Sequence, residues 1–265
     1  MCLTCGCGEP SAAHHHKHAH GPHDHAHDHG HGHDHGHEHD HEHDHGHEHA
    51  ERTLTVRENI LAVNDRRAAA NREWLDRRGV TAVNLISSPG SGKTTLLERT
   101  LDRLNGRLKC GVITGDQETD NDARRLAGKG AEVRQIHTHD ACHLDAARVG
   151  DELSGVVSEG TRLLFIENVG NLVCPAAFDL GEHFKIALLS VTEGEDKPVK
   201  YPTLFSLAAV AVVTKLDLVP HLDFDLAACR DNLRRVHPGM FVFELSARSG
   251  DGMDAWIDYL ESLAG

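Results

Sequence analysis

Residues 87–95 read Ser-Ser-Pro-Gly-Ser-Gly-Lys-Thr-Thr, between an apolar run at 81–86 and a helical pattern that begins at Thr94. A strand, a tight glycine-containing loop and a helix in this order form the context of a phosphate-binding P-loop. Gly90 and Gly92 let the backbone approach a phosphate closely, so that the loop amides and the positive end of the helix face the anion. The stretch therefore predicts a nucleotide-binding α/β domain.

The side chains of this loop have distinct expected roles. Lys93 is expected to place its charge on the β- and γ-phosphates, and the hydroxyl of Thr94 to ligate a nucleotide-bound Mg²⁺. Ser91 and Thr95 complete the predicted cradle. Ser87 stands where the G-x-x-x-x-G-K-[ST] pattern has glycine, so the entry to the turn is expected to differ slightly. The alternative is a Gly/Ser loop that precedes Lys-Thr by chance.

The composition divides the chain in two. Residues 1–51 hold 19 of the 25 histidines, ten acidic residues against one lysine, and almost no large apolar side chain. Such a segment cannot bury a core, so we predict a disordered metal-binding tail at 1–51 and one P-loop domain at 52–265. Of the net charge of −14 the tail carries −9, which leaves −5 on the domain. A mildly acidic domain binds nucleic acid poorly, and we expect no such partner.

Targeting and membrane signals are also missing from the sequence. Residues 1–20 lack an apolar signal region, and the longest apolar runs, at 186–189 and 207–213, are too short to span a membrane. We therefore expect a cytoplasmic protein without a membrane partner. In that compartment the seven cysteines are expected to be buried thiols, metal ligands or redox groups and not disulfides.

Two features of the tail indicate metal binding. Cys2, Cys5 and Cys7 form Cys-x-x-Cys-Gly-Cys, and such thiols can close around one soft or borderline metal ion. Residues 14–49 alternate His with Asp, Glu or Gly, which offers many neutral imidazoles to Ni²⁺, Zn²⁺, Cu²⁺ or Co²⁺. Because a disordered tract fixes no coordination geometry, it suits storage of several ions. An unused cysteine cluster, a zinc knuckle or iron–sulfur ligand set, and a purification tag are the alternatives, although tags are uniform and short.

Beyond the tail the hydrophobic pattern alternates between helices and strands. A helix is expected at 52–79. Strands are expected at seven Val-, Ile- and Leu-rich runs: 81–86, 109–114, 132–136, 163–167, 185–191, 210–214 and 241–245. Repeated β-α units predict an α/β fold with a mostly parallel seven-stranded sheet and helices on both faces. Ligands of such sheets bind at the carboxyl ends of the strands.

Polar motifs follow two of these strand ends. Asp116 lies in an acidic loop and is expected to hold Mg²⁺ through a water or to orient the attacking water. A helix-capping role fits Asp120 and Asn121 better. The run Glu-Asn-Val-Gly from Glu167 to Gly170 occupies the place of the D-x-x-G element of GTPases, in which Gly170 supplies an amide to the γ-phosphate.

A third motif predicts the base. The run Thr-Lys-Leu-Asp that ends at Asp217 corresponds to the guanine-reading N-K-x-D element, with Thr214 in place of the usual Asn. Asp217 can accept hydrogen bonds from guanine N1–H and N2–H₂, an edge that adenine does not present, so we expect GTP rather than ATP. Lys215 is expected to lie along the base. Ser246 and Ala247 are expected to support it through their backbone.

A second metal site is a hypothesis within the domain. Cys142 and His143 are adjacent at an expected helix start, and Cys174 lies in a loop after a neighbouring strand. A thiolate, an imidazole and a second thiolate could converge there on Zn²⁺ or Ni²⁺. From spacing alone, a buried cysteine and a helix-capping histidine are the commoner explanation. Cys110 and Cys229 are expected to be core residues.

The motifs together closely resemble those of the HypB family, the nickel-incorporation GTPases of [NiFe]-hydrogenase maturation. The resemblance rests on the cysteine motif, the His-rich tract, the P-loop, and the sequences at 141–145, 167–175 and 193–202. It implies a P-loop fold of the SIMIBI class, GTP-dependent homodimerisation, and an interfacial metal site built from Cys142, His143 and Cys174. It also implies a tight nickel site at the three N-terminal cysteines, and a contact near the base and the dimer interface at 193–202.

The expected function follows from this resemblance. We expect a slow GTPase that binds GTP/GDP, Mg²⁺, Ni²⁺ and Zn²⁺ and delivers nickel to a hydrogenase large-subunit precursor with a partner of the HypA type. The nucleotide would act as a switch on the Asp116 and Gly170 loops. Two alternatives stay open: a nickel storage or detoxification protein, and a urease-type accessory GTPase, against which the cysteine motifs count.

Overall fold

A computed structural model describes residues 46–116, 121–139 and 141–265, and gives side chains from Glu58 onward. Cys2, Cys5 and Cys7 lie outside the described residues, and no imidazole of residues 14–49 is among the described side chains, so both metal-binding assignments stay predictions. The helix expected at 52–79 begins earlier, at Gly46, and ends at Asp76, where a turn with Gly79 at a positive φ leads into the sheet.

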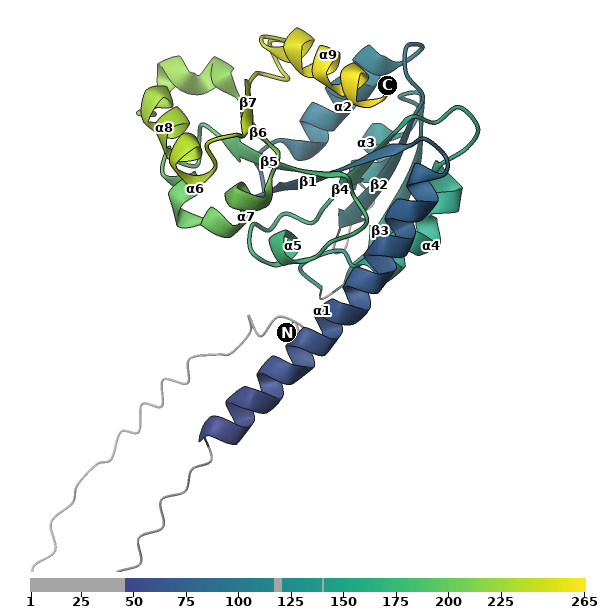
Figure 1. Cartoon of the computed structure of the whole chain (residues 1–265). Coiled ribbons are helices and arrows are strands. Elements are labelled where there is room, and N and C mark those ends of the chain that lie inside the picture. Colours follow the sequence, from purple (N-terminus) through teal and green to yellow (C-terminus); the bar gives the residue numbers. More distant parts are fainter. Residues whose placement is uncertain (1–45, 117–120, 140) are drawn as a thin grey trace, which may run out of the picture.

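Seven strands of the described residues form one sheet in which every pairing is parallel, in the order β3-β2-β4-β1-β5-β6-β7 (Figure 1). Their bounds are β1 Thr81–Ser87, β2 Cys110–Asp116, β3 Ala131–His137, β4 Leu163–Glu167, β5 Phe184–Ser190, β6 Val210–Thr214 and β7 Phe241–Glu244. The predicted fold class is thus confirmed. The sheet is wholly parallel because each connection crosses from the carboxyl end of one strand back to the amino end of the next.

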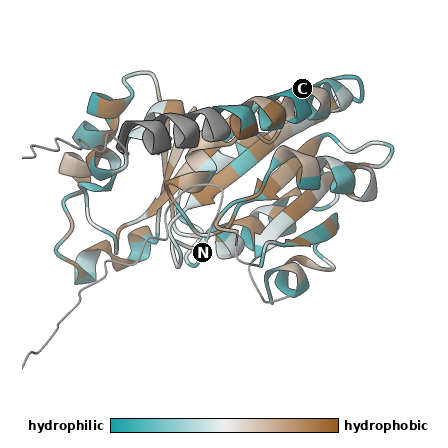
Figure 2. Ribbon diagram, turned by 90° about the horizontal axis from the view of Figure 1, so that it is seen from below, coloured by the Kyte–Doolittle hydropathy of each residue, from teal (hydrophilic) through white to brown (hydrophobic). Residues whose placement is uncertain are grey.

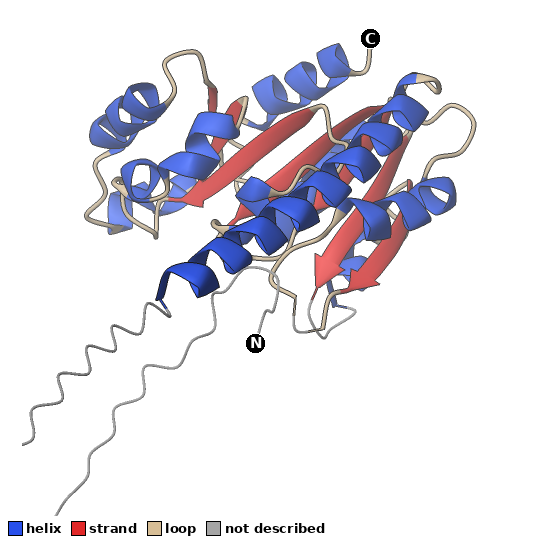
Figure 3. Cartoon of the chain, turned by 60° about the horizontal axis from the view of Figure 1, so that its bottom comes forward, coloured by secondary structure: helices blue, strands red, loops and turns tan. Residues whose placement is uncertain are grey.

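Helices cover both faces of the sheet, as the pattern of buried residues predicts (Figure 3). Their bounds are α1 Gly46–Asp76, α2 Lys93–Leu104, α3 Asn121–Leu126, α4 Ala146–Val156, α5 Cys174–Ala177, α6 Lys197–Lys200, α7 Pro202–Leu207, the 3₁₀ helix η1 Leu216–His221, α8 Leu226–Val236 and α9 Met253–Leu263. Residues of α2, α3 and α9 pack on one face, and residues of α1, α4, α7 and α8 on the other. Among the described helices none is both long and apolar enough to cross a membrane.

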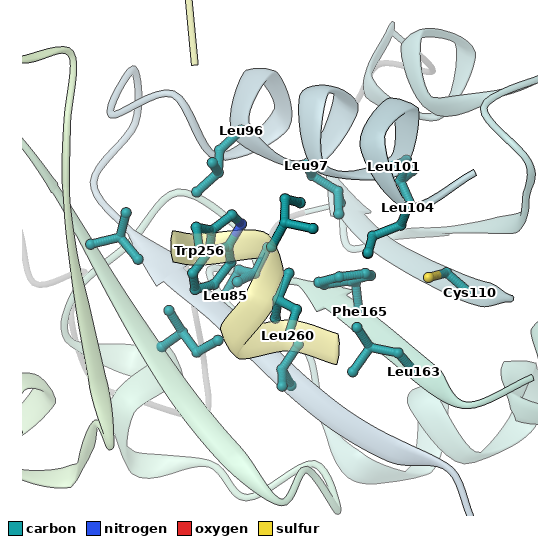
Figure 4. Close-up of a cluster of buried hydrophobic side chains, with 14 of the residues drawn as sticks. Leu85, Leu96, Leu97, Leu101, Leu104, Cys110, Leu163, Phe165, Trp256 and Leu260 are labelled. Atoms are coloured by element: carbon teal, nitrogen blue, oxygen red, sulfur yellow. The ribbon is translucent and has the colours of Figure 1, made fainter. Parts of the chain in front are cut away.

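The core divides along the two faces of the strands, which carry mostly apolar side chains (Figure 2). Leu85 and Phe165 point toward α2 and α9, where Trp256 fills the space between the helices (Figure 4). The next residues along the strands, such as Ile86 and Ile166, pack on the opposite face. Burial on both faces fixes the strand register, and this places all carboxyl ends at one edge.

One buried hydrogen bond joins α2 to α9. The indole Nε1–H of Trp256 donates to Thr100 Oγ1 at 3.0 Å, and both side chains are buried. Substitution Thr100→Val keeps the shape and leaves the indole N–H without an acceptor, so the free energy of unfolding should fall by about 1–3 kcal/mol. Urea unfolding measures this, with the exposed Thr203→Val as control. An equal, small effect of both substitutions would contradict it.

Candidate functional site

A cavity of about 590 Å³ lies over the P-loop, at the carboxyl edge of the sheet. It is lined by Pro89, Gly90, Gly92, Lys93, Thr94, Thr95, Asp116, Asp122, Arg125, Val169, Gly170 and Lys215. Residues from four separate sequence motifs therefore surround one space, because β1, β2, β4 and β6 end at the same edge. Asp122 ends the acidic loop in which the sequence singled out Asp116, and Arg125 lies outside every predicted motif.

The P-loop is held by hydrogen bonds among its own side chains. Lys93 is buried, and its Nζ donates to Ser87 Oγ at 2.9 Å, while Ser91 Oγ donates to the same oxygen. Burial lowers the pKa of Lys93, and the nearby Glu167 carboxylate opposes this effect. Ser87 has no positive φ, since His139 and Lys215 are the non-glycine residues with that geometry in the described part of the chain. Serine therefore fits the turn entry without backbone strain and supplies an acceptor for Lys93.

Glu167 lies beside the predicted Mg²⁺ ligand Thr94. Thr94 Oγ1 donates to Glu167 Oε1 at 2.6 Å, and the buried Oε2 of Glu167 has no hydrogen-bond partner. Burial raises the pKa of Glu167 to about 7, although the charge of Lys93 works in the opposite direction. A hydroxyl, an orphaned carboxylate oxygen and the Asp116 carboxylate at the cavity wall are the hard oxygen donors that Mg²⁺ prefers, so the residues present fit this ion.

A second cavity, of about 200 Å³, adjoins the first and shares Gly92, Thr95 and Lys215 with it. Its other lining residues are Ser91, Leu96, Thr214, Asp217, Leu218, Ser246, Ala247 and Arg248. Ser246 Oγ donates to Asp217 Oδ1 at 2.6 Å, and accepts from the backbone amides of Arg248 and Ser249 at 3.2 and 3.1 Å. The side chain of Ser246, and not only its backbone, orients the carboxylate predicted to read the base.

The base loop is tied directly to the P-loop. Thr214 Oγ1 donates to the carbonyl oxygen of Ser91 at 2.7 Å, and Lys215 Nζ donates to that of Gly90 at 2.7 Å. The short side chain of Thr214 thus makes a structural contact where the motif usually has Asn. Lys215 lies at the boundary between the two cavities, which places its aliphatic stem beside both.

Arg125 is the clearest residue that sequence reasoning missed. Its Nη2 donates to Thr95 Oγ1 and to Glu98 Oε2, both at 3.0 Å, and its guanidinium lines the larger cavity. No motif marks this position, and only its place in α3, after the acidic loop that follows β2, could have indicated it.

The hypothetical metal ligands converge in the structure. One ligand atom each from Cys142, His143 and Cys174 lies within 4.8 Å of the others. His143 is buried, its ring packs on Phe178 with 3.9 Å between centroids, and burial lowers its pKa, so the imidazole stays neutral and available to a metal. The expected helix start is wrong in one respect: α4 begins at Ala146, and Asp145 caps it by accepting from Arg148 N at 2.9 Å.

The two remaining described cysteines are core residues, as expected. Cys110 and Cys229 are buried on β2 and α8. Burial raises the pKa of each thiol to about 12, so both stay protonated near neutral pH and are poor metal ligands.

The chain is similar to several known proteins. Residues 81–244 match the family model described as CobW/HypB/UreG, nucleotide-binding domain. The chain is 53% identical over 211 residues to the hydrogenase maturation factor HypB of Rhizobium leguminosarum bv. viciae, which covers 80% of this chain and 71% of that one. For the protein of the same name from Escherichia coli K12 the values are 49% over 211 residues, 80% and 73%.

Two solved structures have the same architecture. HypB from Archaeoglobus fulgidus is 37% identical with a TM-score of 0.73, covering 77% of this chain and 100% of that one. HypB from Helicobacter pylori in complex with nickel is 37% identical with a TM-score of 0.70, covering 76% and 94%.

The titration of Glu167 makes stability depend on pH. Its pKa is about 7 in the folded chain against an ordinary value of 4.5, so between these pH values the folded state keeps a proton that the unfolded state has released. The free energy of unfolding of the wild type, measured relative to Glu167→Gln, should therefore fall as the pH rises from 4.5 to 7, by roughly 3 kcal/mol at about 1.4 per pKa unit.

Urea unfolding of the nucleotide-free chain at several pH values between about 4 and 8 measures this difference. The comparison uses the change with pH, so a constant effect of the substitution cancels. A difference that stays the same at every pH would show that Glu167 is ionised throughout.

Proposed function

The chain belongs to the HypB family of the CobW/HypB/UreG nucleotide-binding proteins, and from this premise we propose that it is a GTP-hydrolysing nickel metallochaperone of [NiFe]-hydrogenase maturation. One observation carries the proposal: the predicted γ-phosphate loop runs directly into the metal site. Gly170 lines the nucleotide cavity, and Cys174, four residues later, lies within 4.8 Å of the ligand atoms of Cys142 and His143. A movement of this loop would therefore change the metal site.

Hydrolysis would depend on positioning and on neutralising charge. When bound, Mg²⁺ would supply positive charge to the β- and γ-phosphate oxygens. Thr94, Glu167 and Asp116 would hold it, directly or through water. Lys93 would exchange its hydrogen bond with Ser87 for a phosphate, the amide of Gly170 would contact the γ-phosphate, and Asp116 is the candidate to orient the attacking water.

Guanine selectivity is assigned to Asp217. Its carboxylate lies on the wall of the smaller cavity, where Ser246 holds it, and this cavity joins the phosphate cavity through Gly92 and Lys215. The arrangement has room for a base beside a triphosphate and presents an acceptor to it. We therefore assign GTP rather than ATP.

Nickel is the cargo in this proposal. Two thiolates and an imidazole are ligands that both Ni²⁺ and Zn²⁺ accept, and three ligands leave the coordination of either ion incomplete. A second copy of the chain would complete it in a GTP-dependent homodimer. Val173, next to Cys174, has 62% of its surface exposed, which supports a face that becomes covered. The similar chain from Helicobacter pylori was crystallised with nickel, which also favours this ion.

The rest of the chain is assigned to storage and delivery. Cys2, Cys5 and Cys7 would hold one nickel ion tightly, and the imidazoles of residues 14–49 would store more. Delivery would take place in the cytoplasm, to a hydrogenase large-subunit precursor and with a partner of the HypA type.

Replacement of Asp217 tests the nucleotide. Asp217→Asn puts an amide donor against guanine N1–H and removes one acceptor, so GTP affinity should fall by at least roughly 100-fold, while XTP, whose 2-oxo group accepts a hydrogen bond, should gain affinity. Titration with fluorescent GTP, XTP and ATP analogues measures the change. Equal GTP and ATP affinity in the wild-type chain would overturn the assignment.

Metal stoichiometry and mass in solution test the coupled site. The full-length chain should be monomeric with GDP and dimeric with a non-hydrolysable GTP analogue, and the dimer should bind additional nickel that Cys174→Ser abolishes. Lys93→Ala should abolish hydrolysis and leave metal uptake by the tail intact. A GTP-bound monomer, or identical nickel binding by the chain and Cys174→Ser in both nucleotide states, argues against the proposal.

A further inference from the structure

A chain of buried amide groups lies between α1 and the metal site. Asn64 and Asn71 lie seven residues apart on one face of α1, and they are only 7% and 8% exposed. Asn84 in the central strand β1 and Asn168 beside Glu167 are buried completely or nearly so. Four buried asparagines in one region need an explanation, because an apolar side chain at each position would cost less desolvation.

Asn64 and Asn71 each join the first residue of α4, shortly after His143, to the loop that follows α5, the short helix that begins at Cys174. Asn64 Oδ1 accepts from Ala146 N at 2.9 Å, and its Nδ2 donates to the Asp179 carbonyl at 2.7 Å. Asn71 Nδ2 donates to the carbonyls of Ala146 and Leu180, at 2.7 and 3.0 Å. Ala146 is three residues after His143, and Asp179 and Leu180 follow Cys174 by five and six. The two amides therefore tie the segment that follows His143 to the segment that follows Cys174.

The neighbours of Asn71 leave room for this contact. A Cβ added to Gly150 of α4 would lie 2.6 Å from Asn71 Oδ1, and one added to Gly181 would lie 2.5 Å from Asn71 Cβ. Two glycines from different segments thus let α1 approach both α4 and the loop before β5. Dense packing on both sides leaves the Asn71 amide little freedom to turn away from its partners.

The same network reaches the nucleotide loop. Asn168 Oδ1 accepts from Leu144 N at 3.2 Å, directly after His143, and its Nδ2 donates to Asn84 Oδ1 at 3.3 Å. Asn84 in turn donates to Glu182 Oε1 at 3.2 Å, and Glu182 Oε2 accepts from Leu180 N at 2.6 Å. A shift of the segment from Glu167 to Gly170 would therefore pull on both ligand loops at once.

We propose that Asn64 and Asn71 are positioning residues for the Cys142–His143–Cys174 site, and that Asn168 connects their amide network to the nucleotide loop. Through these two side chains, helix α1 keeps the three ligands at metal-binding distance. The inference rests on the proposed function, since it assigns residues that position its metal site. Helix α1 would then have two roles: it covers the sheet, and it positions the metal ligands.

The test uses the full-length chain with Cys2, Cys5 and Cys7 replaced by serine. Thiolate-to-nickel charge-transfer absorption then arises from Cys142 and Cys174, because Cys110 and Cys229 are buried thiols. Asn64→Leu and Asn71→Leu keep the number and branching of the side-chain heavy atoms and remove the amide. Each should weaken nickel binding by roughly 10- to 100-fold and shift the charge-transfer band, as expected when groups that orient ligands are lost.

Thr100→Val is the matched control, since it removes a buried hydrogen bond on the other face of the sheet. It should lower stability and leave the band and the nickel affinity unchanged. If Asn71→Leu does not fold between the two glycines, Asn71→Ala replaces it. Unchanged affinity and band in the asparagine variants, or equal weakening by Thr100→Val, would overturn the role of Asn64 and Asn71.

The role of Asn168 has its own readout. The ratio of nickel affinities with GDP and with a non-hydrolysable GTP analogue should approach one in Asn168→Leu, and a ratio equal to that of the parent would overturn the connection. If the parent chain itself shows no thiolate-to-nickel band, the proposed metal site fails, and the inference fails with it. A band in the parent that the asparagine variants leave intact rejects the inference alone.

Discussion

The parallel pairing of β1 with β4 is the constraint on which the functional edge depends. In this register Leu85 lies opposite Glu167, so the P-loop that leaves β1 and the loop that leaves β4 start side by side. Thr94 then reaches the Glu167 carboxylate, and burial on both faces of the sheet keeps that carboxylate away from water. A raised pKa and an unpartnered oxygen are the consequence, and a cation at this position would compensate the buried negative charge.

The same pairing places the nucleotide cavity and the candidate metal ligands at one edge. Beyond Glu167 the chain passes Gly170 at the nucleotide cavity and reaches Cys174 at the metal cluster. The loop with His143 follows β3, and the backbone N–H of Leu144 donates a hydrogen bond to the side chain of Asn168. Covalent continuity and a buried hydrogen bond therefore both connect the two sites. Helix α1 packs on the sheet and also bonds to the segments that follow His143 and Cys174.

Sequence reasoning predicted the fold well because strand signals in a buried parallel sheet are strong. Each expected strand lies within two residues of the observed one, and the P-loop fixes the first βα unit. It was less reliable at the site. Ser87 looked like a departure from a glycine pattern and instead accepts a hydrogen bond from Lys93, while no motif marked Arg125. Local sequence patterns do not indicate which residue, distant in sequence, will line a cavity.

The sequence by itself determined the parallel α/β class and the nucleotide motifs, because these depend on residue type and on short spacings. It named Cys142, His143 and Cys174 only as candidate metal ligands. Only the tertiary structure decided that Cys142, His143 and Cys174 meet, since His143 and Cys174 are 31 positions apart, with α4 and β4 between them. It also decided that Asn64 and Asn71 connect the segments that follow His143 and Cys174. Three of these hydrogen bonds join residues 75 to 115 positions apart in sequence. Such contacts depend on which elements pack together, and no local pattern encodes that choice.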